Sequence, residues 1–198
     1  MKPLIRLASV ADAGQIQSIY APVVRDTVIS FELEPPELDE IRRRMEDVLA
    51  TLPWLVCERD GLVLGYAYAS KHRARWAYQW SVDTSVYIHE SARRMGIGRA
   101  LYTSLFKILS LQGYYNAYAG IALPNPGSVG LHEAVGFRPV GVYHHVGYKM
   151  EAWHDVGWWE LELQPHVPEP PAPQGIEETQ QLPGWQTALK AGEKLLKP

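Results

Sequence analysis

A strand, a glycine-bearing turn and a helix follow one another in the middle of this chain, and this order limits the possible folds more than any other feature. Residues 82–88 carry β-branched side chains at alternating positions, which favours a strand, and residues 97–112 carry apolar side chains at helical spacing. Gly96 and Gly98 lie where the two meet and allow a tight turn. The chain is therefore predicted to start a helix directly after a central strand.

The turn at Gly96 and Gly98 has the properties of an anion site. The first turn of a helix presents unpaired backbone N–H groups at the positive end of the helix dipole, and phosphate is an anion often bound there. Arg93, Arg94 and Arg99 surround the turn and add positive charge. The sequence therefore predicts that a ligand with phosphate groups binds here.

Two common phosphate-binding motifs do not fit this turn. A P-loop ends in glycine, lysine and a hydroxyl residue, whereas Gly98 is followed by Arg99 and Ala100. A dinucleotide-binding turn needs a third glycine where Leu101 stands, and an acidic residue about twenty positions further on. No acidic residue lies between Arg99 and Ala122, so both motifs are excluded.

The pattern that remains, Arg93-x-x-Gly96-x-Gly98, resembles the signature with which the GNAT N-acetyltransferase superfamily holds the pyrophosphate of acetyl-coenzyme A. Taken alone, these six residues are also compatible with a solvated arginine turn that begins a helix. A second segment resembles a further GNAT signature, in which an asparagine begins a helix that ends in Gly-Phe. Asn125 is a good N-cap and Gly136 suits the position after the last helical residue, so the resemblance agrees with helix chemistry.

Several more segments resemble one subgroup of that family, the phosphinothricin and methionine sulfone (sulfoximine) acetyltransferases. The matching segments are residues 80–88, 131–134, 147–149 and 153–159. Together the resemblance covers roughly residues 3–163. It implies acetyl-CoA as co-substrate, a small-molecule amine as acceptor and a homodimer.

The resemblance also implies how acetyl-CoA is held. The pantetheine arm would pair with one central strand like an added strand, and the pyrophosphate would lie on the arginine turn. The cofactor-binding residues predicted in this way are Val86, Tyr87, Ile88, Arg93, Arg94, Met95, Gly96, Ile97, Gly98, Arg99, Asn125 and Ser128.

Three residues are candidates for the chemistry. Asp83 stands where the subgroup carries glutamate and is the first candidate for the general base, directly or through water. Its side chain is one methylene shorter, and an aspartate at a strand start is equally well explained as structural. His132 matches the subgroup's Leu-His-Glu motif and is a candidate proton relay, although a single helical histidine is more often structural. Tyr143 is a candidate donor of a proton to the leaving thiolate.

A basic, aromatic segment just before the central strand suggests how the acceptor is recognised. Arg73 or Arg75 offers a two-point pair to a carboxylate or oxidised-sulfur group, and aromatic walls would exclude water. Glu32 is a candidate partner for the substrate ammonium, or an exposed loop residue. The substrate-binding residues predicted are Phe31, Glu32, Arg73, Arg75, Tyr78 and Trp80.

Composition narrows the alternatives. The net charge of −3 gives no general reason to bind nucleic acid, and no uncharged run approaches the ~20 residues that cross a membrane. One cysteine, Cys57, excludes an internal disulfide and fits a cytoplasmic protein, and no metal site is expected. Two other activities stay open: acetylation of a protein N-terminus, lysine or polyamine, and non-catalytic sensing of acyl-CoA.

Alternating strands and helices predict an α/β or α+β fold, with a hairpin at Asp60-Gly61. The resemblance implies the GNAT arrangement: a mixed, mostly antiparallel sheet with helices on both faces, whose two central parallel strands splay apart. Strands are expected at residues 5–8, 54–58, 63–69, 82–88, 115–123, 137–145 and 149–163, and helices after Ser9 and at 35–52, 97–112 and 125–135.

The composition changes after residue 163. Six prolines lie among polar residues between positions 165 and 183, which argues against a ladder or a long helix and favours a linker or surface wrap. Residues 1–163 are therefore predicted to form the acetyltransferase domain and residues 164–198 a C-terminal extension. A short helix with Trp185, Leu189 and Leu196 on one side is expected within the extension if it docks.

Overall fold

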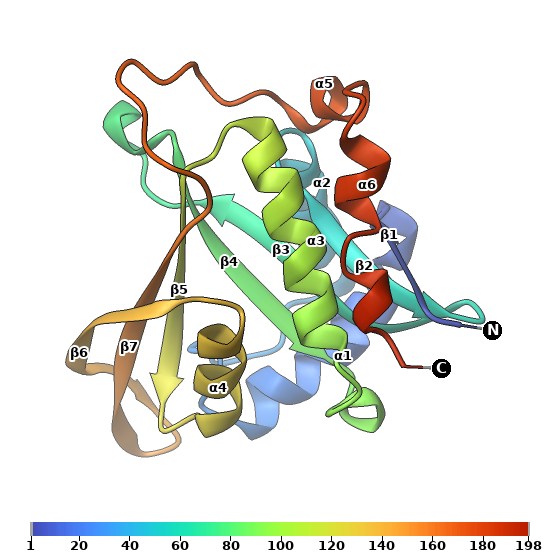
Figure 1. The fold of residues 1–198 in the computed structure, drawn as a ribbon. Coiled ribbons are helices and arrows are strands. Elements are labelled where there is room, and N and C mark those ends of the chain that lie inside the picture. The colour runs from blue at the N-terminus through green and yellow to red at the C-terminus, as the bar shows by residue number, and fades with distance from the viewer. Residues whose placement is uncertain (1, 198) are drawn as a thin grey trace.

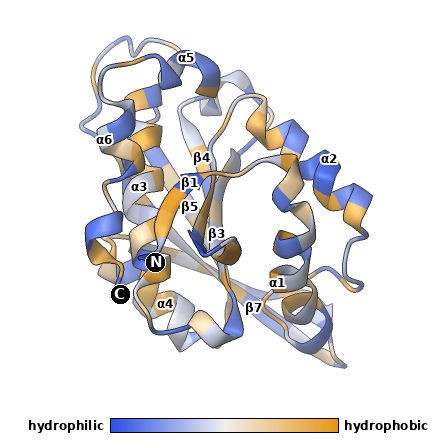
Figure 2. Ribbon diagram, turned by 90° about the vertical axis from the view of Figure 1, so that its right-hand side faces the viewer, coloured by the Kyte–Doolittle hydropathy of each residue, from blue (hydrophilic) through white to orange (hydrophobic). Residues whose placement is uncertain are grey.

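A computed structural model describes residues 2–197 as one seven-stranded sheet with helices on both faces (Figures 1 and 2). The strand order is β1-β2-β3-β4-β5-β7-β6. The strands are β1 (Leu4–Leu7), β2 (Trp54–Arg59), β3 (Leu62–Lys71), β4 (Ser81–Ile88), β5 (Asn116–Leu123), β6 (Arg138–Lys149) and β7 (Ala152–Glu162). The helices are α1 (Ala13–Asp26), α2 (Leu38–Leu49), α3 (Ile97–Gln112), α4 (Pro126–Ala134), α5 (Ile176–Gln180) and α6 (Trp185–Leu189), with 3-10 turns η1 (Val10–Asp12), η2 (Trp76–Tyr78), η3 (Glu90–Ala92) and η4 (Glu193–Leu195).

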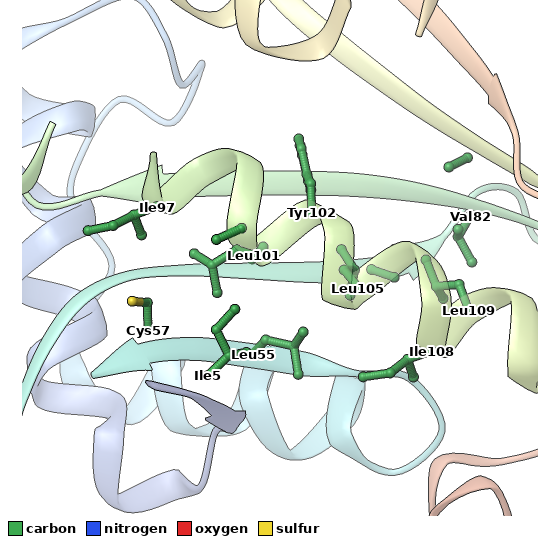
Figure 3. Packing of buried hydrophobic residues seen from close by; sticks show 14 of the residues in the cluster. Ile5, Leu55, Cys57, Val82, Ile97, Leu101, Tyr102, Leu105, Ile108 and Leu109 are labelled. Atoms are coloured by element: carbon green, nitrogen blue, oxygen red, sulfur yellow. The ribbon is translucent and has the colours of Figure 1, made fainter. Parts of the chain in front are cut away.

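Two hydrophobic clusters hold the layers together, one on each face of the sheet. On one face α3 buries Leu101, Leu105 and Ile108 against sheet residues that include Leu55 and Val82 (Figure 3). On the other face α1 and α2 cover a second cluster, whose buried members include Ile16, Met45, Trp54, Val56 and Tyr66. Because both faces are covered, the sheet is largely apolar on both sides.

The sheet is antiparallel except at its centre. β4 and β5 run parallel and pair only at Ser81↔Asn116, Val82↔Ala117 and Asp83↔Tyr118. Beyond these pairs the two strands diverge (Figure 1), while β5 keeps its full pairing with β7. This confirms the mixed, mostly antiparallel sheet and the splayed central pair.

The β2–β3 and β6–β7 hairpins differ in how clearly their sequences predict the turn. Asp60 and Gly61 both have positive φ, 54° and 80°, as a two-residue hairpin of the predicted kind requires. The β6–β7 turn was predicted between residues 145 and 149 but lies at Met150 and Glu151, with φ of 50° and 61°. Neither residue is glycine or asparagine, so the usual turn signal is missing there.

The expected break at His145 is a bulge rather than a strand end. His145 has a φ of 50°, and the β6–β7 register shifts between Tyr143 and Gly147. The Asp155 carboxylate accepts hydrogen bonds from the His145 backbone N–H and, at 2.9 Å, from His144 Nδ1. β6 therefore continues to Lys149 and forms one edge of the sheet.

The C-terminal extension docks along α3, as Figure 1 shows for α5 and α6. Ile176, Trp185 and Leu196 are buried in the same cluster as the inner face of α3. Gly192 lies so close to α3 that a Cβ atom there would collide with the Ala100 carbonyl. The short helix expected at residues 185–196 is observed as α6 followed by η4, and treating residues 164–198 as a separate unit stays a prediction.

Among the described residues, no helix combines the length and the apolar character needed to cross a membrane.

Candidate active site

A narrow cleft opens where β4 and β5 part. Its cavity volume is about 60 Å³, and its walls come from both diverging strands, from α3 and from the first turns of α4. The lining residues are Ile29, Thr84, Ser85, Val86, Tyr87, Tyr102, Gly120, Ile121, Ala122, Asn125, Ser128 and His132. Sequence positions up to about a hundred residues apart therefore meet at one point.

The β4 edge that faces the cleft carries unpaired backbone groups. β4 pairs with β3 along residues 82–88 on one side, but its pairing with β5 stops at Asp83. The predicted residues Val86, Tyr87 and Ile88 all lie beyond that point. An extended ligand with amide groups can hydrogen-bond to such an edge.

Side chains of β4 alternate between the two faces of the sheet. Val82 and Val86 pack in the cluster under α3, whereas Tyr87 packs in the cluster under α1 and α2. By the same alternation Asp83 and Ser85 project to the α1–α2 side. The cleft thus connects a face that carries the arginine turn with a face that carries Asp83.

The turn before α3 has the geometry predicted for an anion site. Gly96 has a φ of 82° and precedes the helix, and the first intrahelical bond runs from Ala100 N–H to the Gly96 carbonyl. Within residues 2–197 the N–H groups of Ile97, Gly98 and Arg99 have no acceptor. These donors remain available for a ligand oxygen.

Arginine side chains surround this turn without partners. Arg93, Arg94 and Arg99 are all exposed, and in the described part of the chain none pairs with a carboxylate. Met95 and Ile97, also predicted, instead anchor the turn by packing on the main cluster. The turn therefore combines fixed N–H donors with mobile positive charge.

Gly98 has a second reason to be glycine. A Cβ atom at this position would lie 2.8 Å from Leu131 Cδ2 of α4. The glycine therefore permits α3 and α4 to approach each other as well as permitting a ligand to approach the backbone.

The start of α4 forms the other wall of the cleft. Asn125 caps the helix by accepting the Ser128 backbone N–H at 3.1 Å. His132 lies one turn further on and is buried. Its Nδ1–H donates to the Ser128 carbonyl at 2.8 Å, which leaves the Nε2 lone pair to accept the Tyr102 hydroxyl at 2.9 Å.

His132 is held in its neutral form. Burial lowers the pKa of His132, and the hydrogen bond to the Ser128 carbonyl only partly opposes that shift. Both ring nitrogens are already bonded, so the side chain fixes the position of the Tyr102 hydroxyl. Tyr102 lines the cleft, although the sequence analysis did not single it out.

On the opposite face, Asp83 is bonded to a histidine. His72 follows β3, and its Nδ1 lies 2.7 Å from Asp83 Oδ1. The imidazole stacks on Tyr118 at 4.5 Å and meets the edge of the Tyr78 ring at 5.8 Å. Burial raises the pKa of Asp83, while the hydrogen bond from His72 opposes this shift.

The segment between β3 and β4 carries three of the residues predicted to bind the acceptor, and their side chains differ in the contacts that they make. The Arg73 guanidinium lies 5.8 Å from the centre of a Trp158 ring and donates to the His72 carbonyl. The Arg75 side chain is exposed and makes no hydrogen bond or ion pair within the described residues. Trp80 donates its indole N–H to the Pro171 carbonyl at 2.7 Å, which ties it to the C-terminal extension.

The loop after α1 brings two further predicted residues to this face. The Phe31 ring lies directly against Gly147 of β6 and 6.3 Å from the His154 ring. Glu32 accepts the Tyr20 hydroxyl at 2.9 Å and pairs with Arg44 at 2.7 Å, so its charge is already compensated.

Lys149 fixes this loop to the edge of the sheet. Its buried ammonium donates to the Val24 carbonyl at 2.6 Å and to the Ser30 carbonyl at 2.7 Å. A lysine at the end of a strand carries no sequence signal for such a role.

Tyr143 lies away from the gap between β4 and β5. It is on the edge strand β6, 52% exposed, with its ring 5.7 Å from that of Trp158. Two strands separate it from the gap beside β4, and it does not line the cleft.

No group of three or more His, Cys, Asp or Glu side chains could hold a metal ion among residues 2–197.

Comparison with known proteins identifies the fold and its chemistry. The family described as "Acetyltransferase (GNAT) domain" matches residues 5–158. The chain belongs to the GNAT acetyltransferase family. It is therefore an acyltransferase, and the matched region contains every residue of the cleft.

Individual GNAT relatives resemble the chain over most of their length. Phosphinothricin N-acetyltransferase of Streptomyces viridochromogenes is 39% identical over 169 residues, covering 85% of this chain and 91% of that protein. L-Methionine sulfoximine/L-methionine sulfone acetyltransferase of Salmonella typhimurium is 31% identical, covering 82% and 96%. The crystal structure of a GNAT phosphinothricin acetyltransferase from Sinorhizobium meliloti in complex with AcCoA is 33% identical with a TM-score of 0.82, covering 86% and 94%.

Proposed function

We propose that this GNAT enzyme transfers the acetyl group of acetyl-CoA directly to the α-amine of a small amino-acid analogue. Phosphinothricin, methionine sulfoximine and methionine sulfone are the acceptors that fit best, because relatives named for these substrates align over most of the chain. The observation that carries the proposal is the parting of β4 and β5, which joins an anion-binding face to a face with Asp83.

The acetyl donor enters from the α3–α4 side. Its pyrophosphate would accept hydrogen bonds from the free N–H groups of residues 97–99. The positive charges of Arg93, Arg94 and Arg99 would attract the same group. Its pantetheine amides would pair with the open edge at residues 86–88, near Asn125 and Ser128. A backbone N–H on the same edge is suited to stabilise the developing oxyanion.

The acceptor enters from the opposite face. Arg75 is the candidate for its carboxylate because that guanidinium has no other partner within residues 2–197. Arg73 is a candidate for the phosphinate or oxidised-sulfur group, with Phe31, Tyr78 and Trp80 as walls. Glu32, already paired with Arg44, is better placed to shape this pocket than to bind an ammonium.

The reaction needs two protons removed from the substrate nitrogen and one returned to sulfur. The substrate ammonium loses its first proton to a base at Asp83, and the amine nitrogen then attacks the thioester carbon. The nitrogen loses its second proton as the carbon–sulfur bond breaks, and the thiolate takes a proton. Tyr143 is the donor suggested by the sequence, and Tyr102, a buried residue that lines the cleft, is a second candidate.

Direct transfer agrees with the state of the only cysteine. Cys57 is buried in β2, and burial raises the pKa of its thiol to about 11. A protonated thiol in the core is a poor nucleophile, so an acyl-cysteine intermediate is not expected. The same reduced cysteine is the support for a cytoplasmic location.

We also propose a homodimer. The β6 edge and its β7 neighbour expose a row of apolar side chains close to the acceptor face, and such surfaces commonly bind a second chain. These side chains are Val140, Val142, Tyr143, Val146, Tyr148, Met150 and Trp153.

Steady-state assays of thiol release test the function. Methionine sulfone, methionine sulfoximine and phosphinothricin are each offered with acetyl-CoA, beside spermidine and a peptide with a free N-terminus. Turnover of the amino acids supports the proposal, turnover of the peptide or polyamine alone favours the broader alternative, and none at all favours an acyl-CoA sensor. Arg75→Ala should raise KM for the amino acids by about ten- to a hundredfold. Asp83→Asn should lower kcat at neutral pH while acetyl-CoA affinity is kept.

A further inference from the structure

His72 and Asp83 form an isolated hydrogen-bonded pair on the acceptor face. The distance from His72 Nδ1 to Asp83 Oδ1 is 2.7 Å, and the side chains are 12% and 29% exposed. His72 directly follows β3, which ends at Lys71 opposite Val82, and Asp83 lies in the neighbouring strand β4. The pair is shielded from bulk water but still reachable by a small substrate.

Aromatic rings fix the orientation of the imidazole. Tyr118 stacks on one side of it with an interplanar angle of 21°, and Tyr78 meets it edge-on at 69°. Tyr118 is also the last β5 residue that pairs with β4, directly opposite Asp83. The imidazole is therefore held at the point where the two strands begin to part.

The contact determines which ring nitrogen is free. An ionised Asp83 only accepts hydrogen bonds, so Nδ1 carries the proton and the lone pair lies on Nε2. Within the described residues, Nε2 has no hydrogen-bond partner. A carboxylate that holds one imidazole nitrogen so that the other can accept a proton is a recurring arrangement for general-base catalysis.

We propose that His72 and Asp83 act as one base, in which His72 Nε2 takes the proton from the substrate ammonium and Asp83 orients and stabilises the resulting imidazolium. This deepens the proposed function and rests on it. The N–H bond of the ammonium breaks, an N–H bond forms at Nε2, and the freed lone pair attacks the thioester. The imidazole also extends the reach of a carboxylate that is one methylene shorter than glutamate.

The surrounding charges agree with this assignment. Arg73 lies near enough to stabilise the ionised Asp83, because its positive charge lowers the pKa of that carboxyl. The other titratable groups that face the pair are Tyr78 from η2, Tyr118 from β5 and Tyr68 from β3, with Glu160 of β7 acting on Tyr118. An imidazole is also better matched to neutral pH than a carboxylate as a general base.

Two substitutions separate proton transfer from simple positioning. His72→Asn keeps an N–H group near the place of Nδ1 but has no Nε2, and His72→Ala removes both. Both variants should lower kcat/KM for the amine about a hundred- to a thousandfold at neutral pH, with acetyl-CoA affinity unchanged. The loss should shrink near pH ~9.5, where more of the amine is already neutral. Native-like activity of His72→Asn would show that His72 only positions Asp83.

A matched control uses the other histidine–aspartate pair. His144 Nδ1 lies 2.9 Å from Asp155 on β6 and β7, on the far side of β5 from β4, so His144→Asn should leave kcat/KM unchanged at both pH values.

A tautomer measurement decides the proposal without any turnover. Nitrogen NMR of imidazole-labelled protein should show His72 protonated at Nδ1, and a proton at Nε2 would overturn the assignment. If the native enzyme acetylates none of the amines, the proposed function fails, but the NMR result still tests which nitrogen of His72 carries the proton.

Discussion

The Tyr102 hydroxyl donates a 2.9 Å hydrogen bond to His132 Nε2 and thereby joins α3 to α4 at the wall of the cleft. α3 begins at the arginine turn, and α4 begins at the Asn125 cap. The two helices whose first turns would hold acetyl-CoA are therefore connected by a buried hydrogen bond. His132 has no free nitrogen, so the hydroxyl is the polar group that this pair offers to the cleft.

The first prediction concerns the proton for the leaving thiolate. Tyr102→Phe removes the hydroxyl from the cleft and leaves the His132 lone pair unsatisfied, so kcat should fall about tenfold or more. Tyr143→Phe, on the exposed edge strand, should change kcat less than twofold or so. Steady-state kinetics on both variants decides between them, and a larger loss for Tyr143→Phe would make Tyr143 the donor.

The second prediction follows from the lowered pKa of His132. Because the folded protein binds this proton less readily than the unfolded chain, the stability contributed by neutral His132 is complete above about pH 6.5. This stability is lost as the pH falls from there toward the pKa of His132 in the folded protein. Urea unfolding should show that the unfolding free energy falls less between about pH 7.5 and 5 in His132→Gln than in the native protein. An equal slope would mean that His132 is not buried in its neutral form.

The third prediction tests the arginine turn. Replacing Arg93, Arg94 and Arg99 together by alanine should weaken acetyl-CoA binding about a hundredfold and reduce its salt dependence. Within residues 2–197 these side chains have no internal partners, so the unfolding free energy should hardly change. Acetylpantetheine, which lacks the pyrophosphate, should bind native and variant protein alike in calorimetry. Equal weakening for both ligands would remove the assignment of the turn to the pyrophosphate.

The fourth prediction concerns the C-terminal extension. Gly192→Ala places a methyl group into the Ala100 carbonyl and should lower the unfolding free energy by about 1–3 kcal/mol. Gly130→Ala in α4 meets no atom within 4 Å and should be neutral or stabilising by up to about 1 kcal/mol. Chemical unfolding of both variants makes the comparison. Equal stability would mean that the extension does not depend on this contact.

The sequence predicted the central part of the fold because local rules decide it. Local patterns predict the strand and the helix on either side of Gly96, and another predicts the turn at Asp60-Gly61. The structure confirms these elements. The β6–β7 turn was misplaced because Met150 and Glu151 adopt positive φ without a turn-forming residue. The docking of Trp185 depends on a distant helix face, which no local pattern in a proline-rich segment reveals.

In the candidate site, too, residues placed by a local motif could be predicted, and residues brought together by the fold could not. Residues of the arginine turn and the α4 cap could be predicted because a motif places them together. The link from His72 to Asp83 depends on the β3–β4 register, and that from Tyr102 to His132 on how α3 and α4 pack. Lys149 reaches the loop after α1 across 119 residues from Ser30, which makes it invisible to sequence spacing.

A single competition assay tests the central claim most directly. Native enzyme is given limiting labelled acetyl-CoA and equal amounts of methionine sulfone, its decarboxylated amine and a peptide with a free N-terminus, and the products are resolved by mass spectrometry. We predict that nearly all of the label is found on the α-nitrogen of methionine sulfone, because Arg75 and the aromatic walls select a small acid. Label found mainly on the peptide or on the decarboxylated amine would contradict the account.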